Sequence, residues 1–262
     1  MIDIHAHILC CGDDGAACVE ETIQMAEEFS RTGVSCVVAT PHFIHGSLEI
    51  EPEKIIGLTE EYNQLLKSKN INLTIVPGME IEMCHEIPGL LKAGKLLTLN
   101  QQGRYMLVEL PFHSVPPFTQ QVFYELKLLG ITPILAHPER NRELCEHPEP
   151  IWEMVQRGVL MQINGGSLLG YFGSRVKRRA VSLIESNVVH LIAGDAHQAD
   201  GERGPCLHLV RPVLKKIVGE EKTQVLLNDN PRRVLEGEKV ISFEPKKPKT
   251  GFAGFLNRIL GK

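Results

Sequence analysis

Residues 2–9 carry the sequence Ile-Asp-Ile-His-Ala-His-Ile-Leu, whose apolar side chains predict a β-strand at the start of the chain. His5 and His7 are two positions apart, so both imidazoles point to the same face of such a strand. Polar residues of the types that bind metal ions recur farther along, mostly just after short apolar, β-branched runs. They stand in Asp14, Thr40-Pro41-His42, Gly78-Met79-Glu80, Val108-Glu109, Ala136-His137-Pro138 and Gly194-Asp195-Ala196-His197. Polar groups at the carboxyl ends of strands are typical of the active sites of (β/α) barrels.

Strand-like and helix-like segments alternate along the chain. Strands are expected at residues 2–9, 34–40, 71–76, 105–110, 132–136, 159–163 and 188–193. Helices are expected at residues 19–31, 52–67, 118–129, 150–157, 176–186 and 205–218, with short helices at 222–227 and 231–235. Nearly all-apolar strands that alternate with helices predict a parallel sheet buried on both faces. We predict that this sheet closes into a barrel, because an open sheet would concentrate the polar groups at one switch point.

The length and composition are those of a folded protein. At 262 residues the chain suits one α/β barrel or two smaller domains, and 43% hydrophobic residues support a full core. The net charge of −4 gives no signature of nucleic-acid binding. Seven cysteines, an odd number without a Cys-x-x-Cys pair, favour reduced thiols and a cytoplasmic location. We expect neither a signal peptide nor a membrane span.

The C-terminal residues differ in composition from the rest, so we predict a main domain over 1–240 and a linker with a short tail over 241–262. The linker is basic and contains proline, and residues 251–262 (GFAGFLNRILGK) place apolar side chains at helical spacing among basic ones. One interpretation is a helix docked on the barrel, or a frayed tail. The other is an amphipathic anchor for a membrane surface or a membrane-bound partner, at the inner face of the membrane.

The polar residues predict a metal centre when they are taken together. Imidazoles combined with carboxylates suit Mn, Fe or Zn better than Mg or Ca alone. Each motif is ambiguous by itself, because His-x-His pairs are often structural and Asp13-Asp14-Gly15 is also a turn sequence. Glu80 and Glu109 are more informative, since a carboxylate at the end of an apolar strand is costly to bury unless it is paired or metal-bound.

A centre of two or three metal ions is suited to hydrolysing a phosphoester, because it neutralises phosphate oxygens, activates a water and stabilises the leaving oxygen. Arg140 follows the fifth predicted strand, and Arg203 follows the last pair of candidate ligands. Either guanidinium could hold a phosphate through two parallel hydrogen bonds. Arg142 is assigned to the solvated surface. The sequence contains no Cys-x5-Arg phosphate loop and no Walker A loop, so other phosphate chemistries are not supported.

At these residues the sequence resembles the polymerase-and-histidinol-phosphatase (PHP) superfamily. Within it, the chain is similar to the bacterial PHP tyrosine phosphatases of the CpsB/YwqE type, which act with capsule and exopolysaccharide operons. The resemblance extends from residue 1 to about residue 240, through the stretches MIDIHAHIL, DDG, ATPH, PGMEI, LVELPF, ILAHPERNRE, QINGGSL, AGDAH and NDNPRRVL. It implies a distorted (β/α)7 barrel of the PHP type that holds three divalent metal ions, Mn first, with Fe, Zn or Mg as alternatives.

The resemblance also implies roles for individual residues. It distributes nine ligands over three metals: His5, His7, Glu80 and Asp195 at the first, Glu80, Glu109 and His137 at the second, and Asp14, His42 and His197 at the third. Arg140 stands at the position of the family's phosphate-binding arginine. Arg203 falls one position later than the corresponding arginine of relatives. Arg140, Arg203 and Asp14 are the catalytic candidates.

Three functions are compatible with these residues. The first is a Mn-dependent protein tyrosine phosphatase that acts on the phosphotyrosine tail of a membrane-associated bacterial tyrosine kinase controlling polysaccharide synthesis. The second is a PHP phosphatase of a small phosphoester such as histidinol phosphate. The third is a non-catalytic kinase-binding module, and the complete ligand set argues against it. A homo-oligomer is compatible with each of the three.

Overall fold

The computed structural model describes residues 1–246 of the chain. All its strand pairs are parallel. The strands are β1 (Ile2–Ala6), β2 (Cys36–Ala39), β3 (His42–Phe43), β4 (Thr74–Pro77), β5 (Glu80–Glu82), β6 (Tyr105–Glu109), β7 (Thr132–Ala136), β8 (Leu160–Asn164) and β9 (Leu191–Ala193).

The strands close into a barrel with seven positions, two of which are occupied by broken strands. β2 and β3 follow each other across residues 40–41, and β4 and β5 across residues 78–79, so each pair fills one position. One sheet has the order β1-β2-β4, and the other has the order β3-β5-β6-β7-β8-β9. A parallel bridge between Ala6 and Ala196 brings β1 beside the end of β9. The described residues thus confirm the predicted barrel, in its distorted (β/α)7 form.

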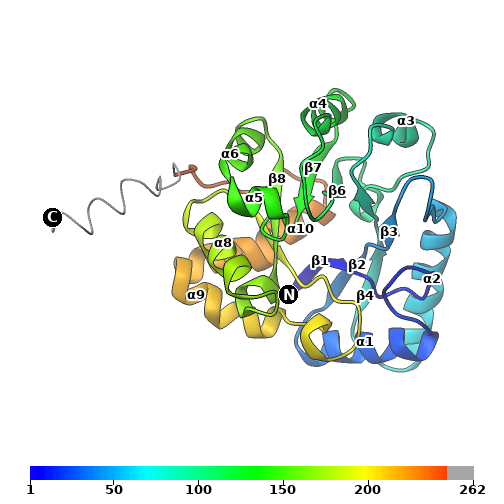
Figure 1. Cartoon of the computed structure of the whole chain (residues 1–262). Helices are drawn as coiled ribbons and strands as arrows, with labels where there is room; N and C mark the ends of the chain where they lie inside the picture. Colours follow the sequence, from blue (N-terminus) through cyan, green and yellow to red (C-terminus); the bar gives the residue numbers. More distant parts are fainter. Residues whose placement is uncertain (247–262) are drawn as a thin grey trace, which may run out of the picture.

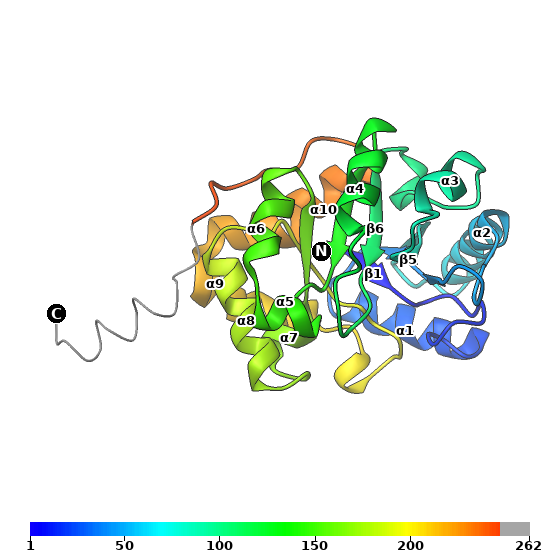
Figure 2. The same cartoon turned by 45° about the horizontal axis from the view of Figure 1, so that its top comes forward.

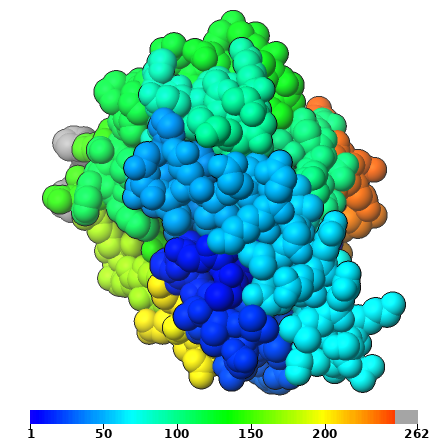
Figure 3. Space-filling model, turned by 90° about the vertical axis from the view of Figure 1, so that its right-hand side faces the viewer, coloured from blue at the N-terminus to red at the C-terminus, as the bar shows by residue number. Residues whose placement is uncertain are grey.

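Helices surround the strands on the outside of the barrel (Figure 1, Figure 2). They are α1 (Val19–Arg31), α2 (Pro52–Ser68), α3 (Ile87–Lys92), α4 (Thr119–Leu128), α5 (Arg142–Glu146), α6 (Glu149–Gln156), α7 (Gly165–Leu169), α8 (Ser174–Glu185), α9 (Leu207–Gln224) and α10 (Asn230–Leu235). In α1, for example, Thr22, Met25, Ala26 and Phe29 are buried at helical spacing, and acidic residues occupy the first turn. In Figure 3, blue to cyan residues from the first part of the chain cover the centre and the lower right of the face, and green residues cover its upper part.

The amino end of the barrel is closed by α10. Its Val234 packs in an apolar cluster with Tyr105 and Leu160, the first residues of β6 and β8. Because parallel strands all run the same way, their carboxyl ends open at the opposite end of the barrel. The candidate metal ligands lie at these carboxyl ends, so the open end of the barrel, opposite α10, is where a metal site can form.

The structure corrects several predicted boundaries. The first strand ends at Ala6 rather than at residue 9, because His7 bonds through its backbone to Ala196 and to Ala16 in the following loop. The predicted helix at 205–218 and the start of the one at 222–227 form one element, α9, interrupted at Gly219, where φ is 81°. Residues 225–227 belong to the π-helical segment Val225–Asp229 that follows it. The sequence did not predict α3, α5 and α7, since five or six residues are too few to show a helical period.

Residues 241–246 continue along the barrel surface beyond the predicted domain end. Trp152 Nε1 donates a hydrogen bond to Lys246 O at 2.8 Å, and Asn230 Nδ2 donates to Ile241 O at 2.9 Å. The folded body therefore includes these residues. The predicted amphipathic tail at 251–262 lies outside the described residues. Within residues 1–246, no helix is long and apolar enough to cross a membrane.

Candidate metal centre

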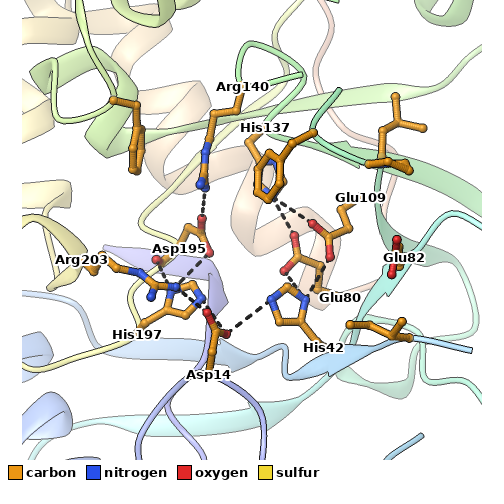
Figure 4. A pocket seen from close by; sticks show the side chains of 15 residues that line it. Asp14, His42, Glu80, Glu82, Glu109, His137, Arg140, Asp195, His197 and Arg203 are labelled. Atoms are coloured by element: carbon orange, nitrogen blue, oxygen red, sulfur yellow. Dashed lines mark hydrogen bonds and ion pairs between the residues drawn. The ribbon is translucent and has the colours of Figure 1, made fainter. Parts of the chain in front are cut away.

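The carboxyl ends of the strands bring all nine predicted ligands together at one mouth of the barrel. Figure 4 shows all of them except His5 and His7. A cavity of about 530 Å³ opens above them and is lined by most of these residues, together with Arg140 and Arg203. His5 and His7 lie below its floor and are fully buried. The local reason is the strand pattern, because most of the ligands stand at or after the last residue of a strand. His5 is inside β1, one residue before its end, and His42 and Glu80 are the first residues of β3 and β5, the second parts of the two broken strands.

The ligand atoms form three overlapping groups, and within each group they all lie within 4.8 Å of one another. The groups are His5, His7, Glu80 and Asp195; His7, Asp14, His42 and His197; and His42, Glu80 and Glu109. The first group is the set that the resemblance implied for the first metal. The second group adds His7 to the set implied for the third metal. The third group contains His42 in place of the implied His137, beside Glu80 and Glu109. His137 is joined to Glu80, with its Nε2 2.8 Å from Oε1.

Buried polar atoms in this cluster fit a set of bound cations. Glu80 Oε2, Asp195 Oδ1 and His42 Nδ1 are buried and have no hydrogen-bond partner among the described residues. Glu80 Oε2 nevertheless lies 3.1 Å from His5 Nε2 and 3.2 Å from His7 Nε2. An unsatisfied buried carboxylate oxygen is costly, and a shared divalent ion would satisfy it. The donor set of imidazoles and carboxylates suits Mn, Fe or Zn.

The electrostatics of the cluster point the same way. Burial alone lowers the pKa of His5, but the carboxylates of Glu80 and Asp195 outweigh burial and raise it to about 9. His7 behaves similarly, with Asp13 and Glu80 raising its pKa to about 10 against burial. The buried carboxylates thus stabilise positive charge on the neighbouring imidazoles. Divalent ions would supply that charge and release the imidazole protons, since only neutral imidazole binds a metal.

Two side chains that the sequence analysis did not single out orient the buried histidines. His7 Nδ1 lies 2.9 Å from Asp13 Oδ2, and His5 Nδ1 lies 3.0 Å from Gln162 Oε1. In each case the hydrogen bond at Nδ1 leaves Nε2 directed at the cluster, as outer partners of metal-bound histidines commonly do. The sequence offered weak signals only, because Asp13 stood in a turn sequence and Gln162 stood in the stretch QINGGSL without a role of its own.

Arg140 is fixed above the cluster by one carboxylate and two aromatic rings. Its Nη1 donates to Asp195 Oδ2 at 2.8 Å, as Figure 4 shows. The guanidinium carbon lies 4.3 Å from the ring centre of Phe172 and 5.0 Å from that of Phe112. Such cation–π contacts hold the flat guanidinium in a defined plane. Sequence reasoning missed both rings, because they belong to separate loops and follow no spacing rule relative to Arg140.

Arg203 and Asp14 form the exposed edge of the cavity. Arg203 Nη2 donates to Asp14 Oδ2 at 2.8 Å, and both side chains are about half exposed. The other oxygen of Asp14 lies 3.2 Å from His197 Nε2. These contacts hold the pKa of Asp14 well below its usual range, the largest cause being the hydrogen bond with His197. Arg142 is exposed and pairs with Glu146 at the surface.

A buried network ties the loop that carries Arg140 to the next strand end. Glu139 Oε1 accepts hydrogen bonds from Asn164 N at 2.9 Å and from Ser167 Oγ at 2.6 Å. Asn164 Nδ2 in turn donates to Asp195 Oδ2 at 2.6 Å, the same oxygen that Arg140 contacts. The network fixes Asp195 from two sides, so its remaining oxygen faces the cluster.

The distorted barrel and the grouped imidazoles and carboxylates at its mouth define the chain as a PHP-type barrel. The chain belongs to the CpsB/CapC family of capsular polysaccharide synthesis, whose model matches residues 1–236. This confirms the family resemblance that the sequence motifs indicated.

Three relatives match almost the whole chain. The tyrosine-protein phosphatase YwqE of Bacillus subtilis is 36% identical over 95% of this chain and 97% of its own length. The putative tyrosine-protein phosphatase CapC of Staphylococcus aureus is 32% identical over 93% of this chain and 92% of its own. The tyrosine-protein phosphatase CpsB of Streptococcus pneumoniae is 32% identical over 90% and 98%.

Solved structures agree with the sequence matches. One crystal structure comes from a study that describes YwqE of Bacillus subtilis and CpsB of Streptococcus pneumoniae as metal-dependent tyrosine phosphatases. It superposes on this chain with a TM-score of 0.89 at 36% identity, and the match covers 94% of this chain and 98% of the other. A histidinol phosphate phosphatase of Lactococcus lactis, complexed with zinc, L-histidinol and phosphate, has a TM-score of 0.52 at 14% identity and covers 84% and 94%. This second likeness shows the shared fold alone.

Proposed function

We propose that the protein is a metal-dependent protein tyrosine phosphatase. It hydrolyses phosphotyrosine on a bacterial tyrosine kinase that regulates capsular or exopolysaccharide synthesis. The observation that carries the proposal is the position of Arg140, an aromatic-flanked guanidinium above a cluster of nine metal-type ligands. The activity of the relatives supports it, since YwqE and CpsB are tyrosine-protein phosphatases at 32–36% identity.

Three divalent ions, Mn in the active enzyme, would be held by the nine ligands, and they would supply charge to the phosphate oxygens and activate a water. Arg140 binds the phosphate through parallel N–H groups, which match the spacing of two phosphate oxygens. Asp195 accepts a hydrogen bond from one N–H group of Arg140, and this contact fixes the direction of the other N–H groups of the guanidinium. Asp14 and Arg203 close the exposed side of the cavity.

The lining of the cavity favours an aryl phosphate over an alkyl one. Phe112 is 48% exposed beside Arg140, and Leu110, Pro111 and Phe172 extend the apolar wall. A tyrosyl ring can pack on this wall while its phosphate reaches the ligand cluster. The tyrosyl oxygen is also a good leaving group, since its conjugate acid has a pKa of about 10. A small polar ester such as histidinol phosphate would leave the wall uncovered.

The proposal is tested by hydrolysis of a tyrosine-phosphorylated kinase-tail peptide, with Mn added and with a chelator. We expect phosphate release that requires Mn and is about 100-fold slower in Arg140→Ala. Histidinol phosphate and phosphoserine peptide are the comparison substrates. A much higher kcat/KM for histidinol phosphate would establish the small-ester phosphatase instead. A metal-loaded protein that binds the peptide without hydrolysing it would establish the binding module.

We further propose that the enzyme works in the cytoplasm at the inner face of the membrane, held there by residues 251–262. The basis is the sequence alone, in which Phe252, Phe255 and Ile259 have helical spacing among basic residues. The test compares the full chain with a chain ending at residue 250 for partitioning onto anionic vesicles. Equal partitioning of the two proteins would refute the anchor.

A further inference from the structure

A second group of arginines lies beside the candidate metal centre. A surface hollow between α5 and α8 is lined by Arg175, Arg178 and Arg179, together with Cys145 and Glu146. Three guanidinium groups therefore face one carboxylate, although the chain as a whole has a net charge of −4. The two helices lie side by side in Figures 1 and 2. We call this feature the arginine hollow.

The charge of the arginine hollow is only partly neutralised. Arg175 pairs with Glu146 at 2.7 Å, and Arg179 donates to Cys145 O through Nη2 at 2.6 Å and Nε at 3.1 Å. Arg178 is exposed, and its guanidinium forms no hydrogen bond or ion pair with any residue in 1–246. Exposed ion pairs stabilise a fold by about 0–1 kcal/mol, and neighbouring like charges oppose it. Stability therefore does not account for this grouping.

The arginine hollow is on the same side of the barrel as the metal-type cluster. α5 follows the carboxyl end of β7, and α8 follows that of β8 after α7. Arg175 is three residues from Phe172 of the cavity wall, so their Cα atoms are at most about 11 Å apart. On the α5 side, Phe112 O accepts a hydrogen bond from Arg142 N at 2.7 Å. Phe172 and Phe112, two residues of the cavity wall, are therefore next to the start of α8 and of α5.

We propose that the arginine hollow binds a second anionic group, a phosphate or a carboxylate, on the same peptide whose phosphotyrosine enters the metal-type cavity. The inference rests on the proposed tyrosine phosphatase function and adds a preference for peptides with acidic or phosphorylated neighbours. An extended peptide advances about 3.3 Å per residue, so about three residues cover the distance from Phe172 to Arg175, and up to about two more cover the length of an arginine side chain. The second group therefore stands about three to five residues from the tyrosine. Guanidinium groups bind phosphate and carboxylate in the same forked geometry.

The test uses three phosphotyrosyl peptides that differ three to five residues on either side of the tyrosine. One carries glutamines there, the second carries glutamates, and the third carries phosphoserines. Formation of tyrosine is followed by its fluorescence with the Mn-loaded full chain. We expect kcat/KM to be about tenfold higher for an anionic peptide than for the glutamine peptide, which corresponds to about 1.4 kcal/mol. The stronger of the two anionic peptides identifies phosphate or carboxylate as the preferred group.

Arg178→Glu should bring this ratio to one or below, and added salt should reduce it in the wild type. The matched control is Arg232→Glu, since Arg232 is an exposed arginine on α10, at the closed amino end of the barrel. We expect the control to keep the wild-type ratio. A wild-type ratio near one, or an unchanged ratio in Arg178→Glu, would overturn the inference while the phosphatase proposal stands. No hydrolysis of any of the three peptides would instead refute the phosphatase proposal.

Discussion

Replacing Arg140 with alanine tests how the site holds phosphate. The side chain is mostly buried, and one of its N–H groups is already committed to Asp195 at 2.8 Å. The remaining N–H groups form the fork for the phosphate. Charge-assisted hydrogen bonds contribute about 1.5–3 kcal/mol each, and two of them give about 3 kcal/mol at the low end. We therefore expect kcat/KM to fall by about 100-fold to 200-fold, since 1.36 kcal/mol is a factor of ten.

The assay measures phosphotyrosyl peptide hydrolysis together with metal content per chain. Arg140→Lys keeps the charge without the planar fork, so it should recover about tenfold of the loss at most. Arg232→Ala, far from the cavity, is the control for removing an arginine. If Arg140→Ala kept more than a tenth of wild-type kcat/KM at equal metal content, the phosphate-holding role would be wrong. If Arg140→Ala bound less metal than the wild type, the main role of Arg140 would be to position Asp195 rather than to hold phosphate.

Three further outcomes follow from the geometry. Phe172→Leu removes the nearer ring from Arg140 and should lower kcat/KM for aryl phosphate by about fivefold to tenfold, as cation–π contacts of about 1 kcal/mol imply; an unchanged value would show that the ring is not needed. Gly194→Ala would place its Cβ 2.4 Å from Asp3 Oδ2, so urea unfolding should show a loss of about 1–3 kcal/mol. The control Gly89→Ala has open space inside helix α3, so it should leave stability unchanged or raise it by up to about 1 kcal/mol. Burial lowers the pKa of His190 to about 4, so its neutral form is favoured in the folded state and stability is lost as pH falls from about 6.5 towards 4. Between pH 7.5 and pH 5 the wild type should therefore lose about 2 kcal/mol more than His190→Gln, and equal losses in denaturant titrations would contradict the assignment.

The barrel could be predicted from the sequence because its determinants are local. Each strand is a short apolar, β-branched run, and each run is followed by residues that end it. The boundaries that failed were those set by distant partners. β1 ends at Ala6 because the backbone of His7 bonds to Ala196, far along the chain. No pattern within residues 2–9 contains that information.

The sequence by itself determined which residue types stand at the strand ends, and so the list of nine candidate ligands that the structure brings together. Only the tertiary structure decided which of these ligands lie close enough to bind the same metal ion, because those distances depend on how the strands close around the barrel. It alone also placed Phe112 and Phe172 on Arg140, and Gln162 on His5. These contacts join residues from separate loops and strands, and their distances are set by packing rather than by sequence spacing.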